Sequence, residues 1–443
     1  MNRLLLLIGI SLFLLAEACT QTPSTNTSVG INDRSRTPSQ RVKTGAEVLI
    51  ERQLSMLKGK KVAIVTHPAA VVFGKIHTVD TLLKAGIQIV KVFAPEHGFR
   101  GEAEAGENIK TGKDKKTGLA VISLYGKNMK PTATQLKDVD VVLFDVQDVG
   151  ARFYTYISTL AYVMEACAEN HIPFYVLDRP NPNGNYVDGP VLEKKYSSFV
   201  GMHEVPIVYG MTIGEYAQMV NEEGWIKQKA DLKIIPMENY RHDLEWEATG
   251  LEWIPPSPNL PTPFSARVYP LLCWYEATVV SVGRGTDTPF EVIGFPLHQG
   301  AEKQWKKDSI LQEKTVLKIE GLEAEAVRFQ PKSIKGKALE PLYLNQTCWG
   351  FQIKRLPPAE DRFRAGVALL DNMYREYNAY FSNRDRQPAI PFFNPPNYFE
   401  RLSGTPLIRK LLTESQTPEV ICKSWQQQVH DFKQIRKKYL RYK

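Results

Sequence analysis

A regular alternation of strands and helices begins at Lys61-Val62-Ala63-Ile64-Val65, a short β-branched run that ends in Thr66-His67-Pro68. Further apolar runs follow at Ile87–Phe93, Ala120–Leu124, Val139–Phe144 and Pro173–Leu177, with helical periodicity at residues 77–85 and 153–169. Continuous apolar strands that alternate with helices are typical of a parallel sheet buried on both faces. This part of the chain therefore predicts an α/β lobe.

Polar or ionisable residues stand at the ends of four of these strands. They are Thr66 and His67, Glu96 and His97, Asp145, Gln147 and Asp148, and Asp178 and Arg179. One such residue alone is more often a helix cap or a turn residue than a functional one. Four strand ends at one rim favour a functional site, because ligands of open α/β sheets bind beyond the carboxyl ends of the strands.

The regular alternation of expected strands and helices ends in the second half of the chain. After a helix expected at 212–224 and a strand at Leu232–Pro236, five prolines occur between Pro255 and Pro263 and predict a stiff extended loop. This loop is either a rigid crossover or a wall of the cleft that offers Ser257, Asn259 and Thr262. Strands expected at 326–329 and 348–353, with helices at 359–377, 406–413 and 417–440, predict a second, α+β lobe.

The N-terminus has the features of an export signal. Arg3 precedes the apolar stretch Leu4–Leu15, which is short for a membrane span, and Ala18-Cys19 resembles the lipobox of bacterial lipoproteins. Lipidation at Cys19 is expected, with simple secretion as the alternative. The polar segment that follows predicts a disordered tether. The expected division is signal peptide 1–18, tether 19–43, catalytic domain 44–286 and auxiliary domain 287–443.

Charge, cysteines and motifs exclude several function classes. The net charge is +8, but the sequence has no basic stripe interleaved with aromatic residues before the C-terminus. Acidic cell-wall material therefore fits this charge better than nucleic acid does. Four cysteines are scattered along the chain (Cys167, Cys273, Cys348 and Cys422), and most of them are expected to be small buried apolar residues, not members of a disulfide framework or a zinc site. Gly283-Arg284-Gly285 has Thr288 where a dinucleotide fingerprint needs a third glycine, and HExxH and GxSxG are absent from the sequence. No cofactor or metal is expected.

A rim rich in carboxylates favours glycoside hydrolysis, in which one acid protonates the leaving oxygen and a second carboxylate activates water or attacks the sugar. Glu96 suits the acid role, because Phe93, Ala94, Pro95 and Phe99 around it are expected to desolvate it and raise its pKa. Asp148 and Arg152 have i, i+4 spacing at the start of the predicted helix and are expected to pair there. Alternatively, Arg152 binds a carboxylate of the substrate.

Several motifs, in order along residues 45–443, together resemble the signatures of NamZ-like exo-β-N-acetylmuramidases. They are Phe93-Ala94-Pro95-Glu96-His97-Gly98-Phe99-Arg100-Gly101, Asp145 to Tyr156, Asp178-Arg179-Pro180-Asn181-Pro182, Pro256 to Thr262, Ser281 to Thr286, Gly404-Thr405 and Arg436 to Leu440. The resemblance implies a Rossmann-like catalytic lobe, a smaller auxiliary lobe, and a cleft between them that releases terminal N-acetylmuramic acid from peptidoglycan fragments. It also makes Glu96 the leading catalytic candidate. Because this sugar carries a lactyl carboxylate, a cation is expected in the pocket, and Arg152, Arg179 and Arg284 are the candidates.

The candidate site follows from both lines of argument. Its catalytic members are Glu96, Asp148 and Glu276, and its substrate-binding members are His67, His97, Arg100, Asp145, Gln147, Arg152, Tyr154, Asp178, Arg179, Asn181, Ser257, Asn259 and Arg284. Two other functions stay open: a muropeptide-binding lipoprotein without catalysis, and a cell-wall amidase or esterase. Retaining, inverting and substrate-assisted mechanisms also stay open. The expected location is outside the cytoplasm, either anchored to a membrane by lipid or periplasmic or extracellular.

Overall fold

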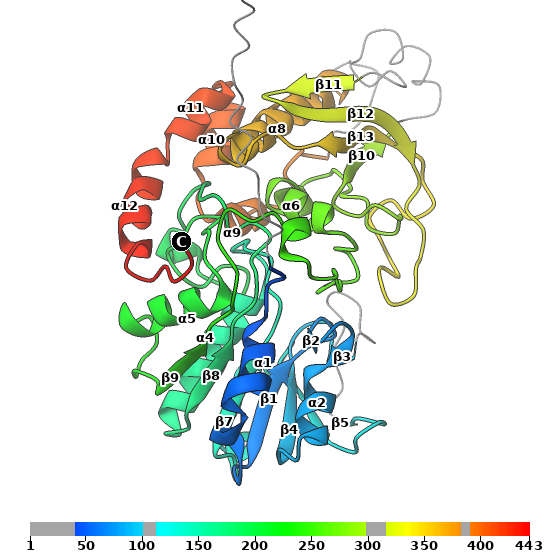
Figure 1. Ribbon diagram of the computed structural model, residues 1–443. Coiled ribbons are helices and arrows are strands. Elements are labelled where there is room, and N and C mark those ends of the chain that lie inside the picture. Colours follow the sequence, from blue (N-terminus) through cyan, green and yellow to red (C-terminus); the bar gives the residue numbers. More distant parts are fainter. Residues whose placement is uncertain (1–39, 101–111, 298–315, 382–389) are drawn as a thin grey trace, which may run out of the picture. The chain divides into compact units, whose positions relative to one another are not determined.

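The computed structural model of the chain describes residues 40–100, 112–297, 316–381 and 390–443 (Figure 1). The predicted signal peptide, the lipidation site Cys19 and nearly all of the tether lie outside these described residues. Among the helices that are described, none is both long and apolar enough to cross a membrane.

A seven-stranded sheet forms the first half of the fold, in the order β5-β6-β4-β1-β7-β8-β9. All neighbouring strands are parallel except β5, which is antiparallel to β6. The strands are β1 (Val62–Thr66), β4 (Ile89–Ala94), β5 (Gly112–Lys113), β6 (Ala120–Ser123), β7 (Val141–Asp145), β8 (Phe174–Leu177) and β9 (Leu232–Ile235). The predicted parallel sheet is confirmed, and its strand order changes direction between β1 and β7.

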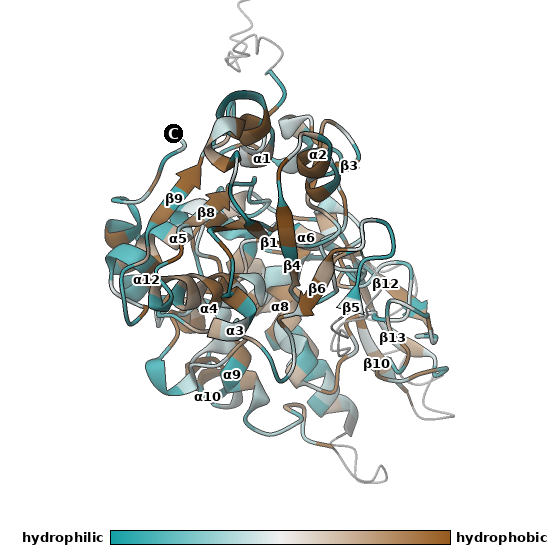
Figure 2. Cartoon of the chain, turned by 90° about the horizontal axis from the view of Figure 1, so that it is seen from below, coloured by the Kyte–Doolittle hydropathy of each residue, from teal (hydrophilic) through white to brown (hydrophobic). Residues whose placement is uncertain are grey.

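Alternate residues of the strands pack on the two faces of this sheet, because side chains along a strand point to opposite sides. Val62 and Ile64 pack with helices α1 (Gly45–Val48) and α2 (Thr78–Lys84). Ala63 and Val65 belong to the larger core, which includes α4 (Tyr156–Glu169) and α5 (Ile213–Glu222). The strands are brown, and therefore hydrophobic, between these helices in Figure 2. Burial on both faces explains why they appear in the sequence as unbroken apolar runs.

The smaller second part has an antiparallel sheet in the order β10-β13-β12-β11 and several helices, as predicted for an α+β lobe. Its strands are β10 (Val292–Pro296), β11 (Val316–Ile319), β12 (Leu322–Phe329) and β13 (Cys348–Arg355). Its helices are α8 (Ala359–Phe381), α9 (Tyr398–Ser403), α10 (Leu407–Thr413), α11 (Pro418–Lys423) and α12 (Gln426–Arg436). Of the described strands and α-helices, those that remain are the hairpin β2 (Val71–Val72) and β3 (Ile76–His77), and helices α3 (Ala133–Leu136) and α6 (Pro263–Leu272).

The terminal helix expected over 417–440 is in fact two helices, α11 and α12, so that prediction was wrong. The break falls at Ser424 and Trp425, where the Trp425 backbone leaves helical geometry at φ −118° and ψ 0°. Trp425 is fully buried and its indole N–H donates to Asp188 Oδ1 at 3.0 Å. A long-range contact therefore overrides local helical periodicity at this point.

The four cysteines outside the signal segment are buried and free, which confirms the prediction that they are small apolar core residues. Burial raises the pKa of the Cys167 thiol, which lies in α4 against the parallel sheet. This environment disfavours the thiolate, so Cys167 is a packing residue.

Candidate active site

A cavity of about 840 Å³ lies beside the carboxyl ends of β4 and β6 and receives walls from both parts of the chain. Three predicted site residues line it: Glu96, Glu276 and Arg284. The full lining is Glu96, Tyr125, Phe153, Thr155, Val200, Tyr269, Cys273, Glu276, Val280, Ser281, Val282, Arg284, Lys337, Ala338, Leu339, Glu340, Pro341, Leu342, Tyr398 and Leu402. Carboxylates and a guanidinium thus share one cavity with aromatic and aliphatic side chains, a combination suited to a sugar that carries a charge.

Glu96 follows β4 in a tight turn, in which His97 and Gly98 have φ of 71° and 80°. The Thr155 hydroxyl donates to Glu96 Oε2 at 2.9 Å and fixes the direction of the carboxyl group. The Tyr125 phenol, after β6, also interacts with this carboxylate; burial first, and then the negative charge of Glu96, raises the pKa of Tyr125. Thr155 and Tyr125 were missed by the sequence argument, although Thr155 lies within the quoted motif from Asp145 to Tyr156.

Glu276 lies in the 3-10 helix η5 (Cys273–Ala277) and forms an ion pair with Arg284, which lines the same cavity. Arg284 Nε donates to Glu276 Oε1 at 2.6 Å, and each side chain keeps 26% of its surface exposed. Desolvation lowers the pKa of Arg284, but the Glu276 charge outweighs it, so that the pKa rises above its ordinary value. Arg284 is therefore charged, and both side chains line the cavity.

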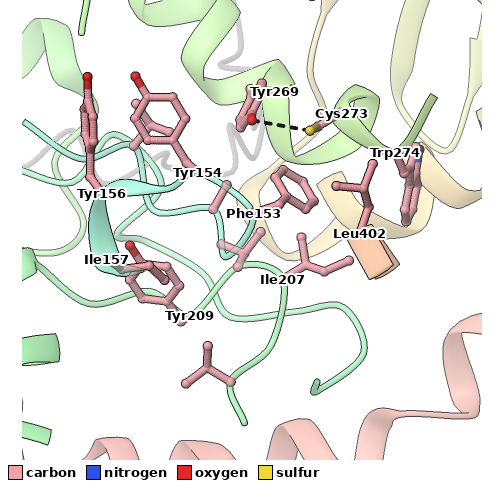
Figure 3. Packing of buried hydrophobic residues seen from close by; sticks show 14 of the residues in the cluster. Phe153, Tyr154, Tyr156, Ile157, Ile207, Tyr209, Tyr269, Cys273, Trp274 and Leu402 are labelled. Carbon is pink, nitrogen blue, oxygen red and sulfur yellow. Dashed lines mark hydrogen bonds between the residues drawn. The ribbon is translucent and has the colours of Figure 1, made fainter. Parts of the chain in front are cut away.

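The floor of the cavity is aromatic. Phe153 and Tyr269 meet edge to face, with ring centroids 5.3 Å apart, and the Cys273 thiol donates to the Tyr269 hydroxyl at 3.3 Å (Figure 3). Leu402 of α9 extends the same cluster from the second part of the chain. These closely packed side chains form an apolar part of the cavity lining.

Asp148 and Arg152 do not pair, which corrects the prediction of an i, i+4 ion pair. Helix α4 begins at Tyr156, so residues 148–152 are not helical and each side chain finds other partners. Asp148 is buried, accepts from Tyr209 and from Gly150 N, and has a pKa raised to about 6, mainly by burial. It does not line the cavity.

Arg152 is fully buried and its guanidinium is occupied by backbone carbonyls. Nη1 donates to Pro190 O at 2.7 Å and Val205 O at 2.8 Å, and Nη2 donates to Leu402 O at 3.1 Å and Ser403 O at 2.6 Å. Burial lowers the pKa of Arg152 to about 9. The last two carbonyls belong to the C-terminal turn of α9. Arg152 therefore stabilises the contact between this helix and the loop after β7.

The polar residues beyond β1, β7 and β8 mainly pair with one another. Arg179 Nε and Nη2 donate to Asp145 Oδ1 at 2.6 Å and Oδ2 at 3.1 Å, and both side chains are buried. His67 is fully buried, accepts from Ala69 N at 2.9 Å, and has a pKa lowered to about 3, chiefly by burial. A small cavity of about 160 Å³, lined in part by Gln147 and Arg179, opens at this point.

The other predicted site residues also lie outside the lining of the large cavity: His97, Arg100, Tyr154, Asp178, Asn181, Ser257 and Asn259. Arg100 pairs with Asp80 and Asp114. Asp178 is fully buried and accepts from Thr212, Gly214 and Tyr442. Their contact with a substrate stays a prediction.

The comparisons with known proteins agree with this architecture. Two family models match the chain: "Exo-beta-N-acetylmuramidase NamZ, N-terminal" at residues 62–264, and "Exo-beta-N-acetylmuramidase NamZ, C-terminal" at residues 267–442. The peptidoglycan β-N-acetylmuramidase NamZ of Bacillus subtilis (strain 168) is 37% identical over 441 residues, which cover 98% of each chain.

Two crystal structures of DUF1343 family proteins from Bacteroides fragilis NCTC 9343 share the fold. They are 37% and 33% identical, with TM-scores of 0.74 and 0.76, and each comparison covers 91% of this chain and 99% of the other. Both matched family models and the relative that is similar over nearly the whole length point to the same conclusion. The chain belongs to the NamZ family of exo-β-N-acetylmuramidases.

Proposed function

We propose that this protein is an exo-acting glycoside hydrolase that releases N-acetylmuramic acid from the non-reducing ends of peptidoglycan fragments, and that it does so in the cavity beside Glu96. The observation that carries the proposal is the meeting of two carboxylates, Glu96 and Glu276, with the Arg284 guanidinium in one cavity of a NamZ family chain. The similar protein from Bacillus subtilis bears the name of a peptidoglycan β-N-acetylmuramidase, which supports the same class of substrate.

Glu96 acts as the general acid in this proposal. Its proton passes to the glycosidic oxygen as the bond from that oxygen to the anomeric carbon breaks. The hydrogen bond from Thr155 to Oε2 supports this role, because a proton donor must be held in a fixed direction. The shortened fragment leaves as an alcohol, and water supplies the oxygen of the released sugar.

Glu276 is the second carboxylate of the proposal. Either it takes a proton from the attacking water or it attacks the anomeric carbon itself, and a third route uses the acetamido group of the substrate. Its ion pair with Arg284 supports this role, because it holds the Glu276 carboxyl group at the cavity. Proton NMR of the first-formed product distinguishes inversion from net retention, which both the nucleophilic and the substrate-assisted routes give.

The proposed activity is tested with 4-nitrophenyl β-N-acetylmuraminide and with a disaccharide that carries N-acetylmuramic acid at its non-reducing end. The expected result is release of nitrophenol from the first and of free N-acetylmuramic acid from the second. Binding of the disaccharide without turnover would indicate a muropeptide-binding protein instead. Release of stem peptide without cleavage of the glycan would indicate an amidase.

We also propose that the protein is exported and anchored through a lipidated Cys19, with the catalytic domain over 44–286 and the auxiliary domain over 287–443. The apolar stretch Leu4–Leu15 and the Ala18-Cys19 pair support the anchor. Cys19→Ser should move the exported protein from the membrane fraction to the soluble fraction and leave its activity unchanged. A wild-type protein that is already soluble after export would contradict lipidation.

A further inference from the structure

The cavity beside Glu96 contains a cation whose hydrogen-bonding capacity is only partly used. Arg284 lines this cavity, and its Nε donates to Glu276. Within the described part of the chain, Nη1 and Nη2 of Arg284 make no hydrogen bond to protein, although the side chain is three-quarters buried. The two nitrogens at the end of a guanidinium form the fork that binds both oxygens of a carboxylate.

The backbone around Arg284 holds the side chain in a fixed place. Gly283 and Gly285 have φ of 73° and 81°, and a Cβ at Gly283 would lie 2.4 Å from Val292 Cγ1. The Thr286 hydroxyl donates to Gly283 O at 2.7 Å and closes the turn. The guanidinium carbon also lies 5.0 Å from the centre of the buried Phe290 ring. Glu276 and Phe290 thus orient Arg284 before any ligand binds, which reduces the entropy lost on binding.

The two other arginines that were candidates for binding an anion are already occupied. Arg152 donates to four backbone carbonyls, and Arg179 forms a two-pronged ion pair with Asp145. Neither lines the cavity that contains Glu96. Lys337 does line it, but this residue is exposed. Water therefore screens its charge and weakens an ion pair with a ligand.

We propose that Arg284 binds the lactyl carboxylate of the substrate through Nη1 and Nη2, and that this contact selects N-acetylmuramic acid over N-acetylglucosamine. The inference rests on the proposed function, since it identifies the part of that substrate which Arg284 meets. The two sugars differ by the lactyl ether, and a carboxylate that leaves water needs a partner of opposite charge. Arg284 then lies between two carboxylates, with Glu276 on Nε and the substrate on the opposite end of the guanidinium.

The test removes the charge from the substrate as well as from the protein. Wild type, Arg284→Met, Arg284→Lys and Lys337→Met are compared on 4-nitrophenyl β-N-acetylmuraminide and on its lactyl methyl ester, which keeps the shape and loses the charge. The wild type should prefer the free acid in kcat/KM by roughly 10²- to 10³-fold, the size of loss seen when one partner of a buried charge pair is removed. Arg284→Met should abolish this preference, Arg284→Lys should keep a small part of it, and Lys337→Met should retain it.

A general loss of activity in Arg284→Met, through disturbance of Glu276, would lower kcat/KM for both substrates equally and leave the preference intact. That result would overturn the assignment of the carboxylate to Arg284, and so would loss of the preference in Lys337→Met alone. If Arg284→Met does not fold, Arg284→Lys decides, because an unchanged preference in that variant contradicts a two-pronged contact. Wild-type protein that hydrolyses neither substrate would instead overturn the proposed function.

Discussion

Two places at the carboxyl edge of the parallel sheet contain the same kinds of residue but differ in how their polar groups are used. Between β1 and β7, where the strand order reverses, Asp145 and Arg179 neutralise each other and His67 is buried. Beside β4 and β6, Glu96 and the Glu276–Arg284 pair face a cavity of about 840 Å³. The comparison shows that a carboxylate at the edge of this sheet is a candidate catalytic residue only where a cavity beside it can hold a substrate.

The reversal of strand order is where open α/β sheets usually bind their ligands. In this chain the segment around Thr44, the β2–β3 hairpin at Val71 and the 3-10 helix that begins at Trp246 line that position, where a cavity of about 160 Å³ remains. The large cavity lies instead beside β4 and β6, where residues of the second part of the chain, such as Leu339, Tyr398 and Leu402, form part of its wall. The second part thus determines where the usable cavity lies.

The largest expected effect is on turnover at Glu96. Glu96→Gln keeps the shape but deletes the proposed proton donor, so kcat on a substrate with a poor leaving group should fall by about 10²- to 10⁴-fold. Steady-state kinetics on a muramic-acid-terminated disaccharide measure it, with circular dichroism to confirm folding. Glu340→Gln, at an exposed residue of the same cavity lining, is the matched control and should keep near-normal turnover. Near-normal turnover in Glu96→Gln would remove Glu96 from the mechanism.

The buried ion pair of Asp145 and Arg179 should respond in stability instead. Arg179→Met leaves the Asp145 carboxylate buried without its partner and should lower the free energy of unfolding by about 3–5 kcal/mol. The exposed pair of Arg241 and Asp243 provides the control, since Arg241→Met should cost less than about 1 kcal/mol. Urea unfolding measures both variants. A stable Arg179→Met protein with a raised KM would instead place Arg179 in the substrate site.

Asp148 should make the stability of the protein depend on pH. Burial raises its folded-state pKa to about 6, above its ordinary value of 3.8, so the folded state holds this proton more tightly than the unfolded state. This contribution to stability is complete below pH 4 and is lost as the pH rises through 6. Asp148→Asn, which resembles the protonated form, should therefore gain on wild type by about 1–3 kcal/mol between pH 4 and pH 7.

Urea unfolding at a series of pH values measures this difference. Tyr209→Phe removes a hydrogen bond that favours the charged form of Asp148, so in its background the gain from Asp148→Asn should be larger. A difference between Asp148→Asn and wild type that does not change with pH would show that Asp148 is ionised at no cost.

The smallest effect concerns the orientation of Glu96. Thr155→Val is nearly isosteric and removes the hydrogen bond to Oε2, which should lower kcat by about tenfold or less. Thr159→Val is the control, because Thr159 lies one turn further along α4 and its hydroxyl donates to Thr155 O. Equal kinetics of the two variants would mean that Thr155 does not position the acid.

The fold could be predicted because its evidence is local. Five strands of the parallel sheet, from Val62–Thr66 to Phe174–Leu177, follow from apolar runs that are buried on both faces, and Glu96 follows from its place after one of them. The partners of Arg152 could not be predicted, because Leu402 O and Ser403 O lie 250 and 251 residues away in sequence. The wall at 337–342 carries no motif that identifies it, so its place in the cavity appears only in the folded chain.

The claim that chemistry takes place beside β4 and β6 is tested most directly by a crystal structure of Glu96→Gln with a bound disaccharide that ends in N-acetylmuramic acid. We expect the glycosidic oxygen within hydrogen-bond distance of the side chain at position 96, and the lactyl carboxylate on Nη1 and Nη2 of Arg284. A disaccharide bound instead between β1 and β7, with its carboxylate on Arg179, would contradict it.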